Sequence, residues 1–161
     1  MRCLLPMTEV AMPPGFEVRP FTADDECALS FLLADAYRGG VEDHGEPFAF
    51  YELDARKTIE GDWGPVLWQA SFWATRNGVV VGATIVTEWP EVSETGLSFA
   101  VVHPDARGLG LGAALIAKSG QALAAAGHSD WVLAVVPDNP AVHLYERLGF
   151  RSFDPHEPIV S

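Results

Sequence analysis

Apolar residues recur at two different spacings in the first third of the chain, and these spacings predict one strand followed by two helices. Apolar and polar positions alternate over residues 16–21, which is typical of a half-buried strand. Apolar positions over 28–37 recur instead with helical spacing. Three polar residues could cap this helix: Thr22, Asp24 and Asp25. A second, weaker helical pattern covers residues 48–59.

The rest of the chain alternates between strand-like and helix-like patterns. Two β-rich runs flank Asn77–Gly78, a pair that supplies positive φ at both positions of a tight turn, so we expect an antiparallel hairpin within residues 71–90. The elements expected after it are a strand over 96–102, a helix over 109–125, a strand over 131–136, a helix capped by Asn139 with Pro140 at its first position, and a strand over 150–153. This order predicts an α/β fold with a mixed sheet.

Length and local composition favour a single domain with a short leader. The chain has 161 residues, of which 48% are hydrophobic, enough for one ordinary core and few for two. Residues 1–14 contain three prolines and no periodicity, and we expect them to form a loose leader before a domain over residues 15–161. No apolar run reaches the roughly 18 residues of a membrane span. We therefore expect a soluble, cytoplasmic protein.

Charge and cysteine usage exclude several classes of partner and cofactor. The chain carries 22 acidic and 10 basic residues, a formal net charge of −12. Nucleic acids and anionic membranes are poor partners, because binding either requires Lys and Arg to displace counterions. The excess acid could favour a cationic substrate, although solubility explains it equally well. Cys3 and Cys27 have neither pairing nor metal-ligand spacing, so we expect reduced thiols and no metal.

A glycine-rich segment carries the first signal of chemistry. Gly108, Gly110 and Gly112 stand between an expected strand and an expected helix. A helix start leaves backbone N–H groups unpaired, and a loop without β-carbons lets those groups approach a phosphate. A turn that merely packs the strand against the helix is the alternative. A dinucleotide fold fits poorly because residues 103–107 separate the strand from the first glycine, and a P-loop lacks its Gly-Lys-Ser/Thr.

Two motifs together resemble the GCN5-related N-acetyltransferases, the GNAT superfamily. The pattern Arg107-x-x-Gly110-x-Gly112, after a strand ending in Val-x-His-Pro, is similar to the family's pyrophosphate-binding signature. The second motif, NPAVHLYERLGF, begins at Asn139 and follows an expected strand. It departs from the family spacing in having one residue between Asn139 and Ala141. The resemblance covers residues 16–153 and is specific over 96–150.

The resemblance implies a single-domain GNAT-like fold that uses acetyl-coenzyme A as cosubstrate. In the family this molecule lies where the parallel fourth and fifth strands, here 96–102 and 131–136, splay apart within a sheet flanked by helices. Its pantetheine pairs with exposed strand backbone, and its pyrophosphate lies on the glycine loop. The cofactor contacts carried over are Ala100, Val101, Val102, Arg107, Gly108, Leu109, Gly110, Leu111, Gly112, Ala113 and Asn139.

The resemblance also implies a general acid and leaves the base open. Tyr145 would give a proton to the departing sulfur, although a tyrosine at this helical spacing could equally be a core aromatic. Some family members carry a glutamate at the position of Gly96. Glu94 shares the face of Gly96 if no bulge intervenes between them, and it is the candidate base. The alternatives are a water chain and three loop carboxylates: Glu42, Asp43 and Glu46.

Together these features predict an N-acetyltransferase that moves the acetyl group of acetyl-coenzyme A directly to a primary amine of a small molecule or peptide, in a ternary complex. Residues 41–69, which mix aromatic and acidic side chains, would shape the acceptor pocket. The identity of the acceptor and a homodimeric assembly stay open. Two other functions are alternatives: a GNAT-fold protein that binds acyl-coenzyme A without transferring it, and a nucleotide-binding oxidoreductase.

Overall fold

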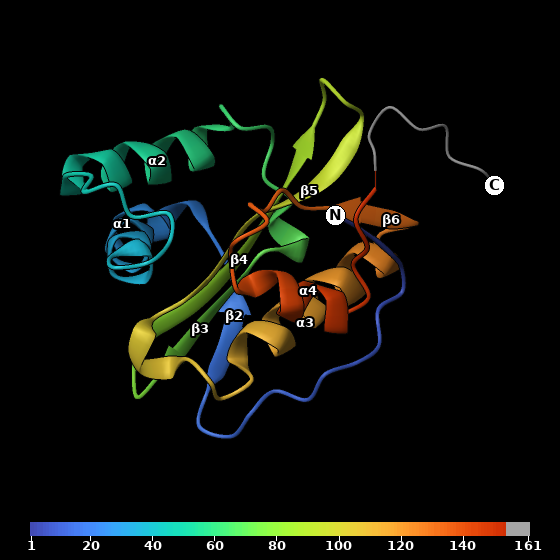
Figure 1. Ribbon diagram of the computed structural model, residues 1–161, viewed down its shortest axis with the longest axis horizontal. Coiled ribbons are helices and arrows are strands. Elements are labelled where there is room, and N and C mark those ends of the chain that lie inside the picture. Colours follow the sequence, from blue (N-terminus) through green and yellow to red (C-terminus); the bar gives the residue numbers. More distant parts are fainter. Residues whose placement is uncertain (154–161) are drawn as a thin grey trace.

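A computed structural model describes residues 1–153 and shows a six-stranded sheet flanked by helices (Figure 1). Residues 154–161, the end of the domain expected over 15–161, lie outside the described residues. The strands are β1 (Arg2–Leu4), β2 (Glu17–Pro20), β3 (Phe72–Arg76), β4 (Val79–Trp89), β5 (Glu94–Val102) and β6 (Asp130–Val132). The helices are α1 (Glu26–Tyr37), α2 (Phe48–Glu60), α3 (Leu111–Ala125) and α4 (Ala141–Arg147).

The sheet has the order β1-β6-β5-β4-β3-β2. Strands β5 and β6 pair in parallel, and the other neighbouring strands pair antiparallel. This arrangement confirms the expected α/β fold with a mixed sheet. It also makes β5, the strand that precedes the glycine segment, a member of the one parallel pair among the six strands.

Local sequence signals account for several element boundaries. Asn77 and Gly78 have φ angles of 52° and 75°, so the turn between β3 and β4 has the expected positive φ at both positions. Before α1, the backbone N–H of Thr22 donates to Asp25 Oδ2 at 2.9 Å, one half of a capping box. Helix α2 ends at Gly61, whose φ of 83° is left-handed. The turn, the cap and the helix end each involve residues that are close in the sequence, which is why a sequence pattern can predict them.

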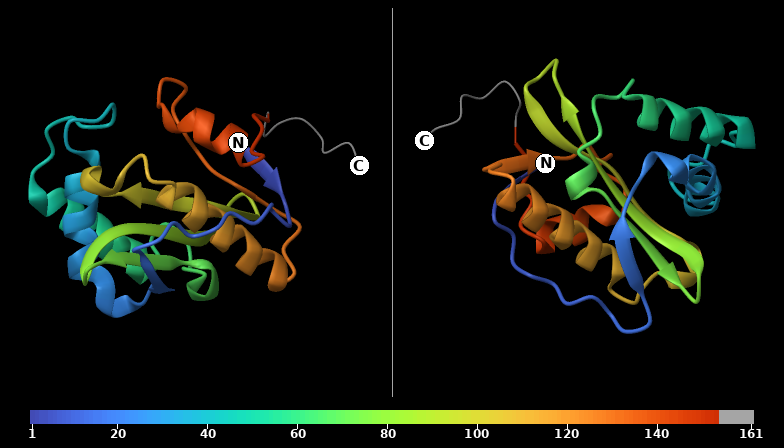
Figure 2. Two further views of the ribbon diagram at one scale, coloured as in Figure 1. Left: turned by 90° about the horizontal axis from the view of Figure 1, so that it is seen from below. Right: turned by 180° about the vertical axis from the view of Figure 1, so that it is seen from behind.

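Helices cover both faces of the sheet (Figure 2), and neighbouring side chains of a strand pack on opposite faces. On β3, Trp73 packs into a cluster with residues of α1 and α2, such as Leu29 and Tyr51. Its neighbours Phe72 and Ala74 pack on the opposite face, in a cluster that includes residues of α3. None of the helices in the described part of the chain is long and apolar enough to cross a membrane.

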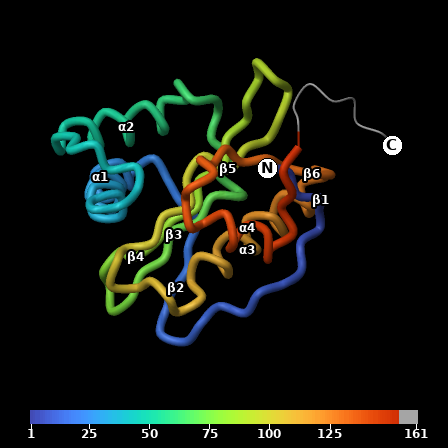
Figure 3. Tube along the Cα trace, viewed as in Figure 1, coloured from blue at the N-terminus to red at the C-terminus, as the bar shows by residue number. Residues whose placement is uncertain are grey.

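The N-terminal segment is part of the sheet, and the expectation of a loose leader over residues 1–14 is wrong. Strand β1 lies at the edge of the sheet beside β6, far away in the sequence, with Cys3 opposite Trp131 (Figure 3). Cys3 and Met7 are only 5% and 7% exposed. A three-residue strand has no periodicity to detect, and its partner lies too far along the chain for a local pattern to indicate it.

The last third of the chain differs from its predicted elements in three ways. Strand β6 ends at Val132, so the strand expected over 131–136 is half as long as predicted. Residues 150–153 form no strand, and only Arg151 makes an isolated bridge, to Arg2. Helix α4 begins at Ala141, after Pro140 rather than with it.

Candidate active site

Strands β5 and β6 form a fork, and a cavity of about 750 Å³ lies along it. The two strands share one register pair, Gly96 with Val132, beyond which the sheet pairing between them stops. The chain after Val132 leaves β5, and the backbone N–H of Leu133 donates instead to Met1 O at 2.9 Å. Residues of both arms line the cavity: Leu97, Ser98, Ala100, Val101 and Val102 from β5, and Leu133, Ala134 and Val135 after β6. The expected splayed strands are therefore present.

The glycine loop lies at one end of this cavity and leads into α3. Gly108 and Gly110 have φ angles of 74° and 86°, and a β-carbon added at either would meet no atom within 4 Å. The loop therefore leaves open space beside the backbone. The N–H of Ala114 donates to Gly110 O at 3.1 Å, so the N–H groups of residues 111–113 precede the helical ladder. Free N–H groups and the positive end of the helix dipole suit a phosphate.

The side chain of Arg107 is held by protein backbone rather than left free for a phosphate. Its Nη2 donates to Ala36 O at 2.6 Å, and its Nε donates to Val102 O at 3.2 Å. Its own backbone N–H donates to Pro104 O at 3.3 Å. Arg107 thus ties the end of β5 to the last turn of α1 and fixes the position of the loop that follows.

Tyr145 projects from α4 and lines the cavity. Its ring packs against Phe150, with centroids 5.9 Å apart and planes at 68°. Burial raises the pKa of the Tyr145 phenol, and the negative charge of Glu42 raises it further. The phenol is therefore protonated at neutral pH and can act as a hydrogen-bond donor. Tyr145 thus lines the cavity and also packs against a core cluster.

Asn139 joins the segment after β6 to the loop between α1 and α2. Its Oδ1 accepts a hydrogen bond from Ala141 N at 2.9 Å, so it braces the turn before α4, although the N-cap is Pro140 rather than the expected Asn139. Its Nδ2 donates to Glu42 Oε1 at 3.2 Å. Both Asn139 and Glu42 line the cavity. The carboxylate of Glu42 is thus brought into the same site as Tyr145.

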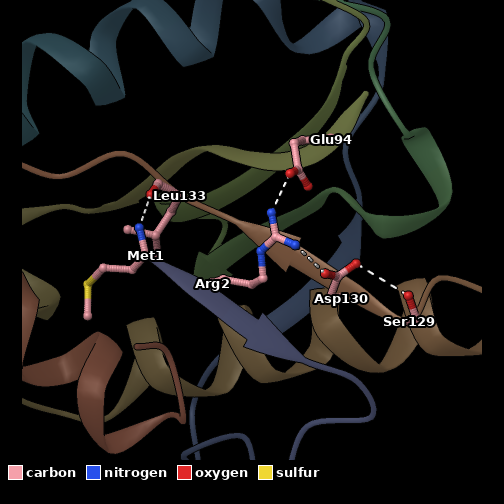
Figure 4. Close-up of polar contacts among 6 residues, drawn as sticks. All are labelled: Met1, Arg2, Glu94, Ser129, Asp130 and Leu133. Atoms are coloured by element: carbon pink, nitrogen blue, oxygen red, sulfur yellow. Dashed lines mark hydrogen bonds and ion pairs between the residues drawn. The ribbon is translucent and has the colours of Figure 1, made fainter. Parts of the chain in front are cut away.

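Glu94 does not line the cavity, and its carboxylate pairs with Arg2 (Figure 4). The register between β4 and β5 shifts next to Ser98, because Ile85 pairs with Phe99 while Val86 pairs with Leu97. No shift lies between Glu94 and Gly96, so the two residues share a face as expected, and the bulge lies after them in the strand. It reverses the alternation, and Leu97 packs in the cluster with Ile116 of α3 whereas Phe99 packs against the α1 and α2 cluster. The placement of Glu94 argues against its role as a base.

Most of the residues expected to contact the cofactor lie together in the lining of one cavity. Of the expected contacts, Leu109 is not part of that lining, and its side chain is 49% exposed. Tyr37 and Arg147 also line the cavity, although no sequence signal had marked them. Their positions follow from the tertiary packing of α1 and α4, which no local motif records. Within residues 1–153, no group of three or more His, Cys, Asp or Glu side chains could hold a metal ion.

A comparison with protein families identifies the family to which this fold belongs. The family model of the acetyltransferase (GNAT) family matches residues 23–150. The chain belongs to this family. The match spans the helices α1 to α4 and the fork with its cavity, and it leaves no support for a nucleotide-binding oxidoreductase. A comparison with curated proteins finds no match.

Solved structures from three organisms share the fold. The GCN5-related N-acetyltransferase from Sphaerobacter thermophilus has a TM-score of 0.70 at 19% identity, covering 91% of this chain and 45% of that chain. This chain therefore spans less than half of that protein. The PaiA N-acetyltransferase from Thermoplasma acidophilum, in complex with coenzyme A, has a TM-score of 0.71 at 14% identity, covering 86% and 91%. A GNAT family acetyltransferase from Brucella melitensis, in complex with acetyl-CoA, has a TM-score of 0.60 at 20% identity, covering 85% and 83%.

Proposed function

We propose that this protein transfers the acetyl group of acetyl-coenzyme A to a primary amine of a small molecule or peptide, directly and within a ternary complex. The observation that carries the proposal is the cavity in the β5–β6 fork, which has unpaired helix-start N–H groups at one end and Tyr145 in its lining. Its volume of about 750 Å³ is in the usual range for ligand sites. The coenzyme A ligands of the Thermoplasma and Brucella relatives support the same cosubstrate here.

The residues present fit the chemical groups of coenzyme A. Residues 108–113 would hold the pyrophosphate through backbone N–H groups, since Gly108 and Gly110 have open space where a β-carbon would lie. The backbone of Ala100 and Val102 would pair with the pantetheine, because β6 has left this edge of β5. Backbone binding also suits an acidic chain, because it needs few cations to hold an anionic cosubstrate.

The chemistry of the transfer assigns a role to Tyr145. An amine nitrogen attacks the thioester carbonyl carbon, a C–N bond forms, the C–S bond breaks, and the sulfur leaves with the bonding electrons. Tyr145 would donate its phenolic proton to this sulfur, and the raised pKa of the phenol keeps that proton in place at neutral pH. The nitrogen loses its extra proton to a carboxylate of the site or to water. A backbone N–H near Ala100 would stabilise the carbonyl oxygen.

Thermal unfolding with coenzyme A and with NAD, followed by an assay of thiol release with a panel of amines, tests the proposal. Coenzyme A at 100 times its Kd should raise the Tm by roughly 5–10 °C, and NAD should leave it unchanged. Acetyl-coenzyme A with an accepted amine should release thiol and yield the acetylated amine. Binding of coenzyme A without thiol release for any amine would favour the binding protein over the enzyme. A Tm shift with NAD alone would contradict the site assignment.

A further inference from the structure

The loop between α1 and α2 carries three carboxylates, and two of them serve the loop itself. Asp43 accepts hydrogen bonds from Gly39 N at 2.6 Å and from Gly45 N at 2.9 Å. These bonds lower the pKa of Asp43 below its ordinary value. Glu46 accepts a hydrogen bond from His44 N at 3.0 Å. Both side chains therefore hold the loop in shape.

Glu42 is the carboxylate of this loop that lines the cavity. It is half-buried, and Asn139 Nδ2 donates to its Oε1 at 3.2 Å from the other side of the fork. Within residues 1–153, no Lys, Arg or His lies within ion-pair distance of this carboxylate. Its charge is thus compensated by one neutral amide donor, and its second oxygen is available to a ligand.

The residues around Glu42 leave its negative charge largely uncompensated within the cavity. Tyr37 and Tyr145 line the same cavity, and burial first and Glu42 second raise the pKa of each phenol. Two cations also belong to the lining, but Arg107 donates to backbone carbonyls and Arg147 is exposed at the end of α4. The part of the cavity around Glu42 therefore presents a carboxylate and two neutral phenols, and such an environment attracts a cation.

We infer that Glu42 is the group that recognises the acceptor, and that the acceptor enters as a protonated amine whose ammonium group binds this carboxylate. Asn139 acts as a positioning residue, because its amide holds Oε1 and orients the carboxylate toward the cavity. The inference rests on the proposed acetyl transfer and narrows its acceptors to aliphatic amines that are cationic at neutral pH. It also gives the three acids of the loop distinct tasks, with two shaping the loop and one facing the substrate.

A pair of isosteric variants tests the inference. Glu42→Gln keeps an oxygen for Asn139 and removes only the charge, and Glu46→Gln makes the same change in the same loop outside the cavity. For the best amine of the panel, Glu42→Gln should raise the KM about 10- to 100-fold, the effect of losing a charged hydrogen bond. Glu46→Gln should change the KM less than about twofold. Coenzyme A affinity and Tm should stay close to wild type in both.

Inhibition by acceptor analogues separates charge recognition from a change in the chemical step. The N,N-dimethylated form of the best amine is cationic, and its inhibition constant against the wild type should increase about 10- to 100-fold in Glu42→Gln. The corresponding alcohol is neutral and should inhibit both proteins equally. Equal KM values and equal inhibition constants in wild type and Glu42→Gln would contradict the role of Glu42 and leave the proposed acetyl transfer intact. If the wild type released no thiol with any amine, both the proposed function and the role of Glu42 would be contradicted.

Discussion

Arg107 Nη2 donates a hydrogen bond to the carbonyl oxygen of Ala36 at 2.6 Å, and this bond joins two segments 71 residues apart. Ala36 lies in the last turn of α1, where unpaired carbonyls and the negative end of the helix dipole favour a cation. The same guanidinium reaches Val102 O at the end of β5. An arginine that the motif assigns to a phosphate therefore serves to hold the helix, the strand and the loop together.

Replacement of Arg107 by alanine should destabilise the protein. Two hydrogen bonds from a charged donor are lost, which costs about 1–3 kcal/mol and lowers the Tm by roughly 3–10 °C. Thermal unfolding measures the effect, with Arg147→Ala as the control because Arg147 is also an arginine of the cavity lining but is exposed. An unchanged Tm combined with a large loss of coenzyme A affinity would mean that the guanidinium serves the phosphates instead.

Replacement of Gly110 by aspartate should weaken coenzyme A binding more than it weakens folding. The φ of 86° makes any side chain cost about 1 kcal/mol here, while the open space around the position accommodates the atoms. The added negative charge would lie beside the N–H groups that are proposed to hold the pyrophosphate. Calorimetric titration of coenzyme A measures the loss, and Gly110→Ala isolates the backbone strain from the charge. Equal affinity in the Asp and Ala variants would leave the loop with a purely structural role.

Signals that are local in the chain predicted most of the fold, and contacts between distant segments account for what was missed. The Asn77–Gly78 turn and helix α2 follow from a few neighbouring residues, and both appear as expected. Strand β1 was missed because its partner near Trp131 lies at the other end of the chain. The glycine loop was found because its pattern is contiguous. The contact of Asn139 with Glu42 was not predicted, because no periodicity in the sequence relates residues 97 positions apart.

Replacement of Glu94 by glutamine tests whether this residue is a base or a structural partner of Arg2. The ion pair ties β5 to β1 and is partly buried, with side chains 17% and 23% exposed for Arg2 and Glu94. We expect a loss of about 1 kcal/mol in the free energy of unfolding, and a kcat within about threefold of wild type, since a general base is usually worth about 100-fold or more. Arg2→Gln should cost at least as much stability, because it also removes the ion pair of Arg2 with Asp130 at 3.0 Å. A kcat lowered 100-fold at unchanged Tm would restore Glu94 as the base.

The ionised carboxylate of Asp25 stabilises the folded protein, and this contribution is lost at acid pH. Burial alone would raise the pKa of Asp25, but hydrogen bonds from Arg19 and Thr22 lower it below its ordinary value. A carboxylate with a lowered pKa in the folded state adds stability above its unfolded pKa of about 3.9, and that stability is lost as the pH falls through the folded value. The Tm difference between wild type and Asp25→Asn should therefore be large at pH 7 and shrink towards pH 2. For exposed Asp24→Asn the difference should be small throughout, and a constant difference for Asp25→Asn would contradict this account.

Replacement of Tyr145 by phenylalanine asks whether the phenol is an acid or only a core aromatic. The ring contact with Phe150 survives the change, and only the hydroxyl of this cavity-lining residue is removed. If that hydroxyl protonates the departing sulfur, kcat should fall about 100- to 10,000-fold while the Tm and coenzyme A affinity stay near wild type. Tyr51→Phe is the matched control, because Tyr51 is buried against Tyr37 and does not line the cavity. The contrary outcome is turnover of the best amine at the wild-type rate by Tyr145→Phe, with chemistry shown to be rate-limiting. Tyr145 would then serve only to pack the core.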